Sequence, residues 1–182
     1  MRIILVVGKS DKLARQLYAS FAEKGHTTVL ARETEILKMR HSRQNPLCFF
    51  IVQGERLSKY FGVCPDIIII EEAPAWKGRT IQRMANSWII VDGQNPEGVE
   101  AAALTGGKVI SCGLRHNSTL FISSLEEDSL TFSLQRRLKT LFQEEVEEQD
   151  KIMKRIKDLD EFGHGALLCT FLLCEKGATG FS

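Results

Sequence analysis

The fold is decided by residues 3–25, which read IILVVGKSDKLARQLYASFAEKG. The apolar run 3–7 is typical of a strand that is buried on both faces of a sheet. The residues after it place apolar side chains at helical spacing on one face, with Ser10 as the candidate N-cap and Gly25 as the C-terminal stop. We therefore predict a buried strand, a tight turn at 8–10 and an amphipathic helix.

The turn Gly8-Lys9-Ser10 matches the end of a phosphate-binding loop. Backbone N–H groups at a helix N-terminus attract anions, and a lysine adds positive charge. The complete loop reads G-x-x-x-x-G-K-[S/T], but the position five residues before Gly8 is Ile3, inside the predicted strand. The loop is too short to wrap a triphosphate in the usual way, and a plain strand-to-helix turn with a cap is the alternative interpretation.

Strands and helices alternate along the rest of the chain. The segment Ile67–Ile70 is four consecutive isoleucines, which predict a central strand. Further strands are predicted at 27–31, 47–52, 88–91, 108–112 and 120–125, and helices at 97–104 and, with weaker patterns, near 56–61 and 80–85. This alternation predicts an α/β fold of three layers: a mostly parallel sheet of the P-loop or Rossmann-like type with helices on both faces.

Several polar residues follow the predicted strands. Ligands bind beyond the carboxyl ends of strands in such sheets, so residues 8–10, Glu71 and the turn 92–95 are expected at one edge. A lysine that neutralises phosphate and a carboxylate that holds Mg²⁺ would then be neighbours. Simpler interpretations exist. Glu71 and Glu72 point to opposite sides of an extended chain, so only one faces the site, and the residues 92–96 are ordinary turn formers.

The composition excludes several classes of protein. The 182 residues, 43% hydrophobic and 26% charged, fit one globular domain with a small extension. The formal net charge of +1 gives no reason to expect a nucleic acid or an anionic membrane as partner. The apolar runs at 3–7 and 166–174 are too short for a signal peptide or a membrane span. We therefore expect a cytoplasmic protein.

The five cysteines are odd in number and form no C-x-x-C motif. This pattern indicates neither a disulfide framework nor a zinc site, and it favours reduced core residues of a cytosolic protein. A metal cluster of His164, Cys169 and Cys174 is a remote alternative.

Residues 89–96 read IIVDGQNP, and residues 108–114 read KVISCGL after a predicted helix. These segments resemble the central ATPase domain of Mur ligases, which has V-I-N-A-D-D-P, a helix, and a strand that runs into V-x-T-Y-G, and the resemblance is strongest over 88–125. The next family strand resembles 120–125, and the similarity covers roughly residues 1–140. The resemblance puts Gly8, Lys9 and Ser10 at the G-T-N-G-K-[S/T] loop. It implies phosphate on Lys9, Mg²⁺ on Ser10 and Glu71, and the nucleoside on Asp92, Gln94 and Asn95.

The sequence also departs from the family pattern. The first glycine of the loop is absent, and Asp92, Gln94 and Asn95 stand where the family has Asn, Asp and Asp. No T-N-x-x-x-D-H-L-D segment lies between Glu71 and Trp88. The chain is too short for the family's N-terminal substrate domain and C-terminal amino-acid-binding domain. A complete amino-acid ligase is therefore not expected.

Two functions fit these observations. The first is a Mur-ligase-like protein that binds ATP or ADP with Mg²⁺; as an enzyme it would form an acyl phosphate from ATP, although no residue is an obvious nucleophile or base. The second is a non-catalytic binding or regulatory module that keeps the fold and has lost the nucleotide site. A dinucleotide-binding Rossmann domain ranks last, because it needs G-x-G-x-x-G directly after the first strand and Gly8 is the only glycine in that turn.

Residues 126–182 are expected to form a C-terminal β/α extension that packs on an α/β domain of residues 1–125. The resemblance implies a strand at 129–135 in a hairpin with 120–124. Beyond residue 135 a helix is favoured, because two groups of apolar residues have helical spacing: Leu134, Leu138, Leu141 and Phe142, and later Met153, Ile156 and Leu159. The apolar run 166–174 must be buried, and a homodimer is the natural expectation if the domain does not cover it.

Overall fold

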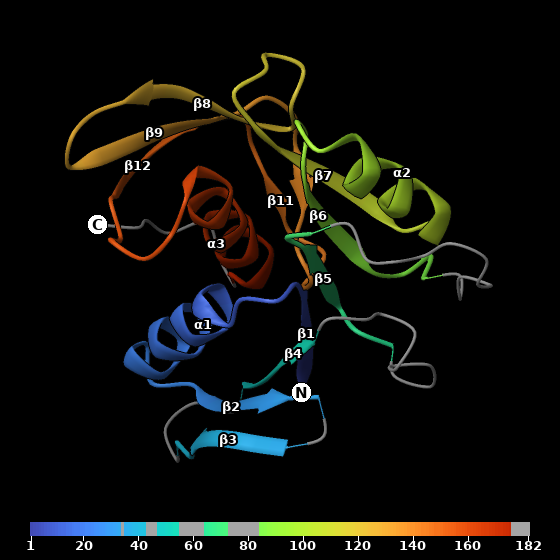
Figure 1. Cartoon of the computed structure of the whole chain (residues 1–182), viewed down its shortest axis with the longest axis vertical. Helices are drawn as coiled ribbons and strands as arrows, with labels where there is room; N and C mark the ends of the chain where they lie inside the picture. The colour runs from blue at the N-terminus through green and yellow to red at the C-terminus, as the bar shows by residue number, and fades with distance from the viewer. Residues whose placement is uncertain (34, 43–46, 55–63, 73–83, 176–182) are drawn as a thin grey trace.

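One sheet of ten strands organises the part of the chain that the computed structural model describes, which is residues 1–33, 35–42, 47–54, 64–72 and 84–175 (Figure 1). The strands of this sheet are β1 (Arg2–Val7), β2 (Thr27–Arg32), β3 (Glu35–Arg40), β4 (Cys48–Gly54), β5 (Ile67–Ile70), β6 (Trp88–Asp92), β7 (Lys108–Gly113), β8 (Leu120–Leu125), β9 (Ser129–Leu134) and β12 (Asp150–Lys154). Their spatial order is β12-β9-β8-β7-β6-β5-β1-β4-β2-β3. The short strands β10 (Leu138–Lys139) and β11 (Glu145–Val146) pair with each other.

The sheet is parallel from β2 to β8. Strand β1 pairs in parallel with β4 and β5, and β5 to β8 continue in the same direction. Strands β3 and β9 run antiparallel to their neighbours β2 and β8, and β12 runs antiparallel to β9. The predicted mostly parallel α/β sheet is confirmed, as is the hairpin of 120–124 with the following strand.

Helices cover both faces of the sheet (Figure 1). Helices α1 (Lys12–Glu23) and α3 (Glu161–Cys174) lie on one face, and α2 (Pro96–Thr105) lies on the other. Strand β1 shows why its apolar run is continuous: Ile4 and Val6 pack into the core under α1 and α3, while Leu5 and Val7 pack into the core under α2. The predicted three layers are therefore present. None of the described helices is long and apolar enough to cross a bilayer.

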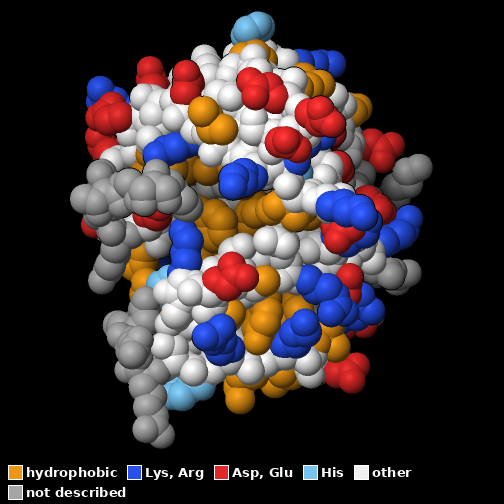
Figure 2. Space-filling model, turned by 90° about the vertical axis from the view of Figure 1, so that its left-hand side faces the viewer, with side chains coloured by type: hydrophobic (Ala, Val, Ile, Leu, Met, Phe, Trp, Pro, Cys, Tyr) orange, Lys and Arg blue, Asp and Glu red, His pale blue; other side chains and the backbone are white. Residues whose placement is uncertain are grey.

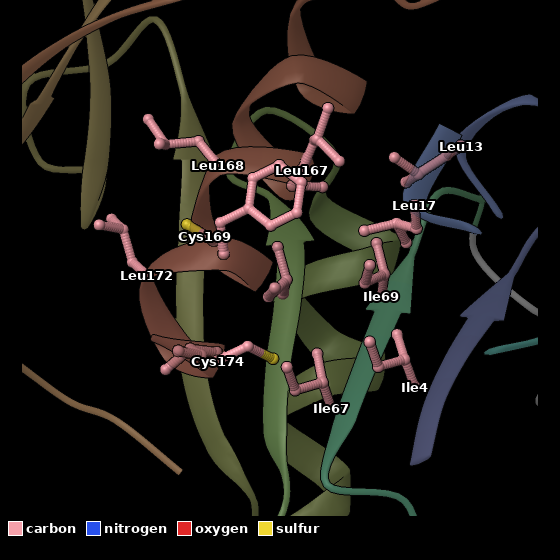
Figure 3. Close-up of a cluster of buried hydrophobic side chains, with 14 of the residues drawn as sticks. Ile4, Leu13, Leu17, Ile67, Ile69, Leu167, Leu168, Cys169, Leu172 and Cys174 are labelled. Carbon is pink, nitrogen blue, oxygen red and sulfur yellow. The ribbon is translucent and has the colours of Figure 1, made fainter. Parts of the chain in front are cut away.

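Helix α3 is the central packing element of the first face. Every residue from Gly163 to Cys174 is buried, because the helix is apolar around its whole circumference. Figure 3 shows Leu167 and Cys169 of α3 in the same cluster as Leu17 of α1 and Ile69 of β5. The run 166–174 is thus covered by the chain itself, so the reason given for a homodimer does not apply, and the homodimer stays a prediction.

The surface on this side mixes both signs of charge. Figure 2 shows acidic and basic side chains of the described residues interspersed, with apolar side chains across the middle of the face. This mixture agrees with the near-zero net charge of the sequence.

The helix predicted from the apolar spacing between Leu134 and Leu159 is wrong. Met153 belongs to β12, whose residues alternate between exposed and partly buried and pair with β9. Ile156 and Leu159 pack against the core from the segment that leads into α3. The backbone of 150–154 obtains its hydrogen bonds from β9, and the more apolar α3 occupies the sheet face instead.

The other local elements include one strand that was not predicted and one helix end that was predicted correctly. Strand β3 was not predicted from the sequence. The helix predicted near 56–61 lies outside the described residues, and so does most of the helix predicted near 80–85. Helix α1 ends as predicted, with Gly25 in the left-handed conformation at φ 78°.

We predict that Leu167→Ala lowers the free energy of unfolding by about 2–5 kcal/mol, because it leaves a cavity in the centre of the core. Leu167 is 1% exposed, whereas Ile152 on the edge strand β12 is 76% exposed. Ile152→Ala is therefore the matched control and should change stability little. Urea unfolding of the two variants checks this, and equal losses in both would contradict the central position of α3.

Candidate functional site

The carboxyl ends of the parallel strands gather the candidate residues at one edge. After β1 the chain passes through residues 8–11 into α1, Glu71 follows β5, and the turn 92–95 connects β6 to α2. Strands β4 and β2 lie on one side of β1, and β5 to β8 lie on the other. The end of β1 is therefore a topological switch point, which is where sheets of this kind bind ligands.

Glu71 lies directly against Gly8. A Cβ atom added to Gly8 would lie 2.6 Å from Glu71 Oε2 and 3.0 Å from Glu71 Cβ, so a larger residue there would displace the Glu71 side chain. The backbone fixes this approach from both sides: the Glu71 N–H donates to the carbonyl of Val7 at 2.9 Å, and the Gly8 N–H donates to the carbonyl of Gly54 at 3.0 Å. These backbone hydrogen bonds hold the Glu71 carboxylate against Gly8, the first residue of the loop.

One carboxylate oxygen of Glu71 is buried, and no ion pair joins Glu71 to another residue in the part of the chain that the structure describes. Its Oε2 atom has no hydrogen-bond partner among the described residues. Burial raises the pKa of Glu71 to about 7, and the charges of Asp160 and Glu72 add to the rise. A buried and unpaired carboxylate is costly in a protein, and strongly shifted carboxyl groups in such positions concentrate at functional sites.

Lys9 and Ser10 are exposed on the loop. Lys9 Nζ lies 3.3 Å from Glu72 Oε2, in a pair in which both side chains are at least half exposed. Glu71 and Glu72 thus face different surroundings: Glu71 lies against the backbone of Gly8, and Glu72 pairs with the exposed side chain of Lys9. Ser10 Oγ accepts a hydrogen bond from the Lys12 N–H at 3.3 Å.

The prediction of Ser10 as the N-cap of α1 is wrong by one residue. The N-cap position belongs to Asp11, whose side chain makes no capping hydrogen bond. Its Oδ2 atom instead accepts hydrogen bonds from Arg15 Nε at 2.6 Å and Arg32 Nη2 at 2.9 Å. Two guanidinium donors outcompete the backbone N–H for this carboxylate.

The turn after β6 is held by its own side chains. Asp92 Oδ1 accepts a hydrogen bond from the Gln94 N–H at 2.8 Å. Asn95 Oδ1 accepts one from the Gly98 N–H at 3.1 Å and so caps α2. The turn that the sequence predicted at 92–96 is therefore present. The cap uses only the Oδ1 atom of Asn95 and not its amide nitrogen.

A small pocket of about 130 Å³ adjoins this turn. It lies between the ends of β6 and β7, the strand β8 and the start of α3, and it is lined by Asp92, Gln94, Gly113, Leu114, Ile122, Asp160, Glu161 and Phe162. Asp160, which lines this pocket, also contributes its charge to the raised pKa of Glu71, behind the larger effect of burial. A pocket of this size holds a small group rather than a whole drug-sized ligand.

Sequence reasoning missed Asp160. The available signal was its position directly before the apolar helix, where its Oδ1 accepts a hydrogen bond from the Gly163 N–H at 2.7 Å and caps α3. Nothing in the sequence indicates that this cap lies near Glu71, which is 89 residues away in the numbering.

The alternative metal cluster at His164 is not formed. His164 Nε2 accepts a hydrogen bond from the Ile156 N–H at 2.8 Å, and its Nδ1 lies 2.7 Å from the carbonyl oxygen of Asp160. Cys169 Sγ lies 3.6 Å from Cys112 Sγ in the core. Within the described ranges no three His, Cys, Asp or Glu side chains are grouped to hold a metal ion. His164 joins the segment before α3 to the helix.

The fold is similar to that of Mur ligases of known structure, as the sequence resemblance predicted. The murein peptide ligase from Psychrobacter arcticus matches with a TM-score of 0.59 and 9% identity, over 96% of this chain and 44% of the ligase. A structure of UDP-N-acetylmuramoyl-L-alanyl-D-glutamate 2,6-diaminopimelate ligase gives a TM-score of 0.58 and 10% identity, over 94% and 42% of the two chains. The chain spans less than half the length of either ligase. No family model and no curated protein sequence matches it.

We predict that Glu71 makes stability fall as the pH rises. Because its pKa is raised from 4.5 to about 7, the folded protein holds the Glu71 proton more tightly than the unfolded chain does. The contribution of Glu71 to the free energy of unfolding is fully present below pH 4.5, the ordinary pKa of the group, and is lost as the pH rises through 7. Between pH 4.5 and 8 this loss amounts to roughly 2 to 3 kcal/mol.

Urea unfolding at several pH values checks this with Glu71→Gln, which cannot ionise, and with Glu100→Gln on the exposed surface of α2 as the matched control. Glu71→Gln should flatten the pH dependence, and Glu100→Gln should leave it as in the wild type. The same slope in all three proteins would show that Glu71 is not the titrating group.

Proposed function

We propose that the protein binds a nucleotide, ATP or ADP with Mg²⁺, where β1 and β5 end. The observation that carries the proposal is the Glu71 carboxylate, which lies against Gly8 with its Oε2 buried and without a partner among the described residues. A divalent cation would supply the missing counter-charge. The adjacent loop Gly8-Lys9-Ser10 has the residues that hold phosphate in phosphate-binding loops.

The residues suit a magnesium ion shared with a ligand. Mg²⁺ is usually bound by one or two carboxylates together with phosphate oxygens and waters, rather than by a cage made only of protein groups. Glu71 and the Ser10 hydroxyl would be its protein ligands. This small donor set agrees with the lack of a three-residue metal cluster among the described residues.

Lys9 would contact the phosphate groups. Its present partner, Glu72, is half exposed, and ion pairs of exposed side chains contribute little stability. Lys9 can therefore leave Glu72 at small cost when a phosphate binds. The N-terminus of α1 follows directly and adds the favourable electrostatics of a helix start, since Asp11 does not cap it.

Asp92, Gln94 and Asn95 would lie on the nucleoside side. Asp92 and Gln94 line the small pocket, and the Asn95 amide nitrogen remains available as a donor. Their backbone turn is fixed by the hydrogen bonds of Asp92 and Asn95, so these side chains are held in place before a ligand arrives.

We do not propose a complete amino-acid ligase. The chain covers 44% and 42% of the two ligases, and no described residue is an evident nucleophile or general base. If the protein is an enzyme, its chemistry would be ATP-dependent and ligase-like. The described cysteines are all free thiols, which supports a cytoplasmic location.

A non-catalytic binding or regulatory module is the second candidate. It is favoured by the short loop and by the contact of Lys9 with Glu72, which is the contact expected when no phosphate is bound. In this case the Glu71 carboxyl would be a neutral, protonated group of the fold at pH values below its raised pKa of about 7.

Calorimetric titration with ATP and ADP, with and without Mg²⁺, separates the two candidates. We expect Mg²⁺-dependent binding to the wild type, at least about tenfold weaker binding to Lys9→Ala because a charge-assisted contact is lost, and loss of the Mg²⁺ dependence in Glu71→Gln. Lys139→Ala and Glu100→Gln change the same residue types at exposed positions and should bind as the wild type does. No binding at millimolar nucleotide would overturn the proposal and favour the second candidate.

A further inference from the structure

The side chain of Gln53 joins two strands to the phosphate-loop residues. Gln53 is 2% exposed at the end of β4, which lies between β1 and β2. Its Nε2 donates to the carbonyl oxygen of Gly8 at 2.5 Å, and its Oε1 accepts from Arg32 Nε at 3.2 Å. One carboxamide therefore reaches the loop on one side and β2 on the other.

Arg32 carries the connection to the other end of the loop. While its Nε donates to Gln53, its Nη2 donates to Asp11 Oδ2 at 2.9 Å. Arg15 Nε donates to the same oxygen at 2.6 Å. The segment 8–11 is thus held at its first residue by Gln53 and at its last residue by Arg32.

The two residues between these attachment points lie on the solvent side, where a ligand can reach them. Lys9 and Ser10 are exposed, whereas Gly8 and Asp11 are fixed by the contacts described above. The loop lacks the preceding residues that wrap a phosphate in the complete motif. The two ends of the shorter segment are instead contacted by side chains of β4 and β2.

A carboxamide is the chemical group that this position requires. It donates at one end and accepts at the other, so it satisfies a carbonyl oxygen and a guanidinium at the same time. A carboxylate could still accept from Arg32 but has no hydrogen to donate to Gly8. Because Gln53 is buried, water does not readily replace a lost bond, and the Gly8 carbonyl would be left unsatisfied.

We propose that Gln53 and Arg32 are positioning residues that hold the loop 8–11 in the geometry that receives the phosphate groups of a nucleoside diphosphate or triphosphate. They act through Gly8 and Asp11 rather than by touching the ligand. The ligand part of this inference rests on the proposed function, whereas the holding of the loop does not.

The competing explanation is that the two side chains only close the edge of the sheet. In that case their replacement lowers the stability of β2 and β4 as a whole. A positioning role instead makes the loop amides exchange faster than those of the neighbouring strands and weakens ligand binding. Local hydrogen exchange therefore distinguishes the two roles.

The experiment compares Gln53→Glu and Arg32→Lys with the wild type. Gln53→Glu removes the donor to Gly8, and Arg32→Lys replaces the fork that spans Gln53 and Asp11 by a single ammonium group. Arg32 is 48% exposed at its side chain, so this variant folds even if a buried charge at 53 does not allow folding. Gln135→Glu makes the same amide-to-carboxylate change at an exposed position and is the control.

Hydrogen exchange of the amides 8–12 is measured without nucleotide, and Mg-ADP affinity is measured by calorimetry. We expect both variants to exchange about five to ten times faster in the loop and to bind Mg-ADP about tenfold more weakly, with Gln135→Glu like the wild type. Unchanged loop exchange overturns the proposal, and so does faster exchange with wild-type affinity. If the wild type itself does not bind Mg-ADP, the proposed function fails, while the loop exchange still decides whether Gln53 and Arg32 hold the loop.

Discussion

The site depends on one close contact, the approach of the Glu71 carboxylate to the backbone of Gly8. Glycine at the end of β1 permits it, because a Cβ atom there would lie 2.6 Å from Oε2 and would displace the Glu71 side chain. The contact also requires that β1 and β5 be neighbours in parallel register, with Val7 paired to Ile70. The cost of the contact is a buried carboxyl whose pKa rises to about 7. Strongly shifted carboxyl groups of this kind are found at functional sites, where a bound cation or a proton neutralises the negative charge.

The rest of the fold keeps this contact in place from both sides of β1. On one side, Gln53 of β4 and Arg32 of β2 hold the loop through Gly8 and Asp11. On the other side, α3 packs against the sheet with every residue from Gly163 to Cys174 buried, and the charge of its N-cap, Asp160, influences Glu71. The candidate site thus sits on rigid strands and a buried helix, which favours a fixed binding geometry.

Much of the fold could be predicted from the sequence, because the signals are local. Four consecutive isoleucines at 67–70 define the central strand, and Gly25 ends α1. Residues 150–159 were misread, because Met153, Ile156 and Leu159 are spaced like a helix, while pairing with β9 decides the structure. Lys9, Ser10 and Glu71 could be named from the ends of strands. Gln53, Arg32 and Asp160 could not, since their partners are distant in the sequence and only the tertiary fold brings them together.

The most direct measurement is a carbon-13 NMR titration of the Glu71 side-chain carboxyl, with and without Mg-ADP. Alone, the group should titrate with a pKa of about 7, as its burial requires. With Mg-ADP bound, an adjacent cation should stabilise the carboxylate and move the pKa below its ordinary value of 4.5. A titration curve for Glu71 that is the same with and without Mg-ADP would contradict a magnesium–nucleotide site at this edge of the sheet.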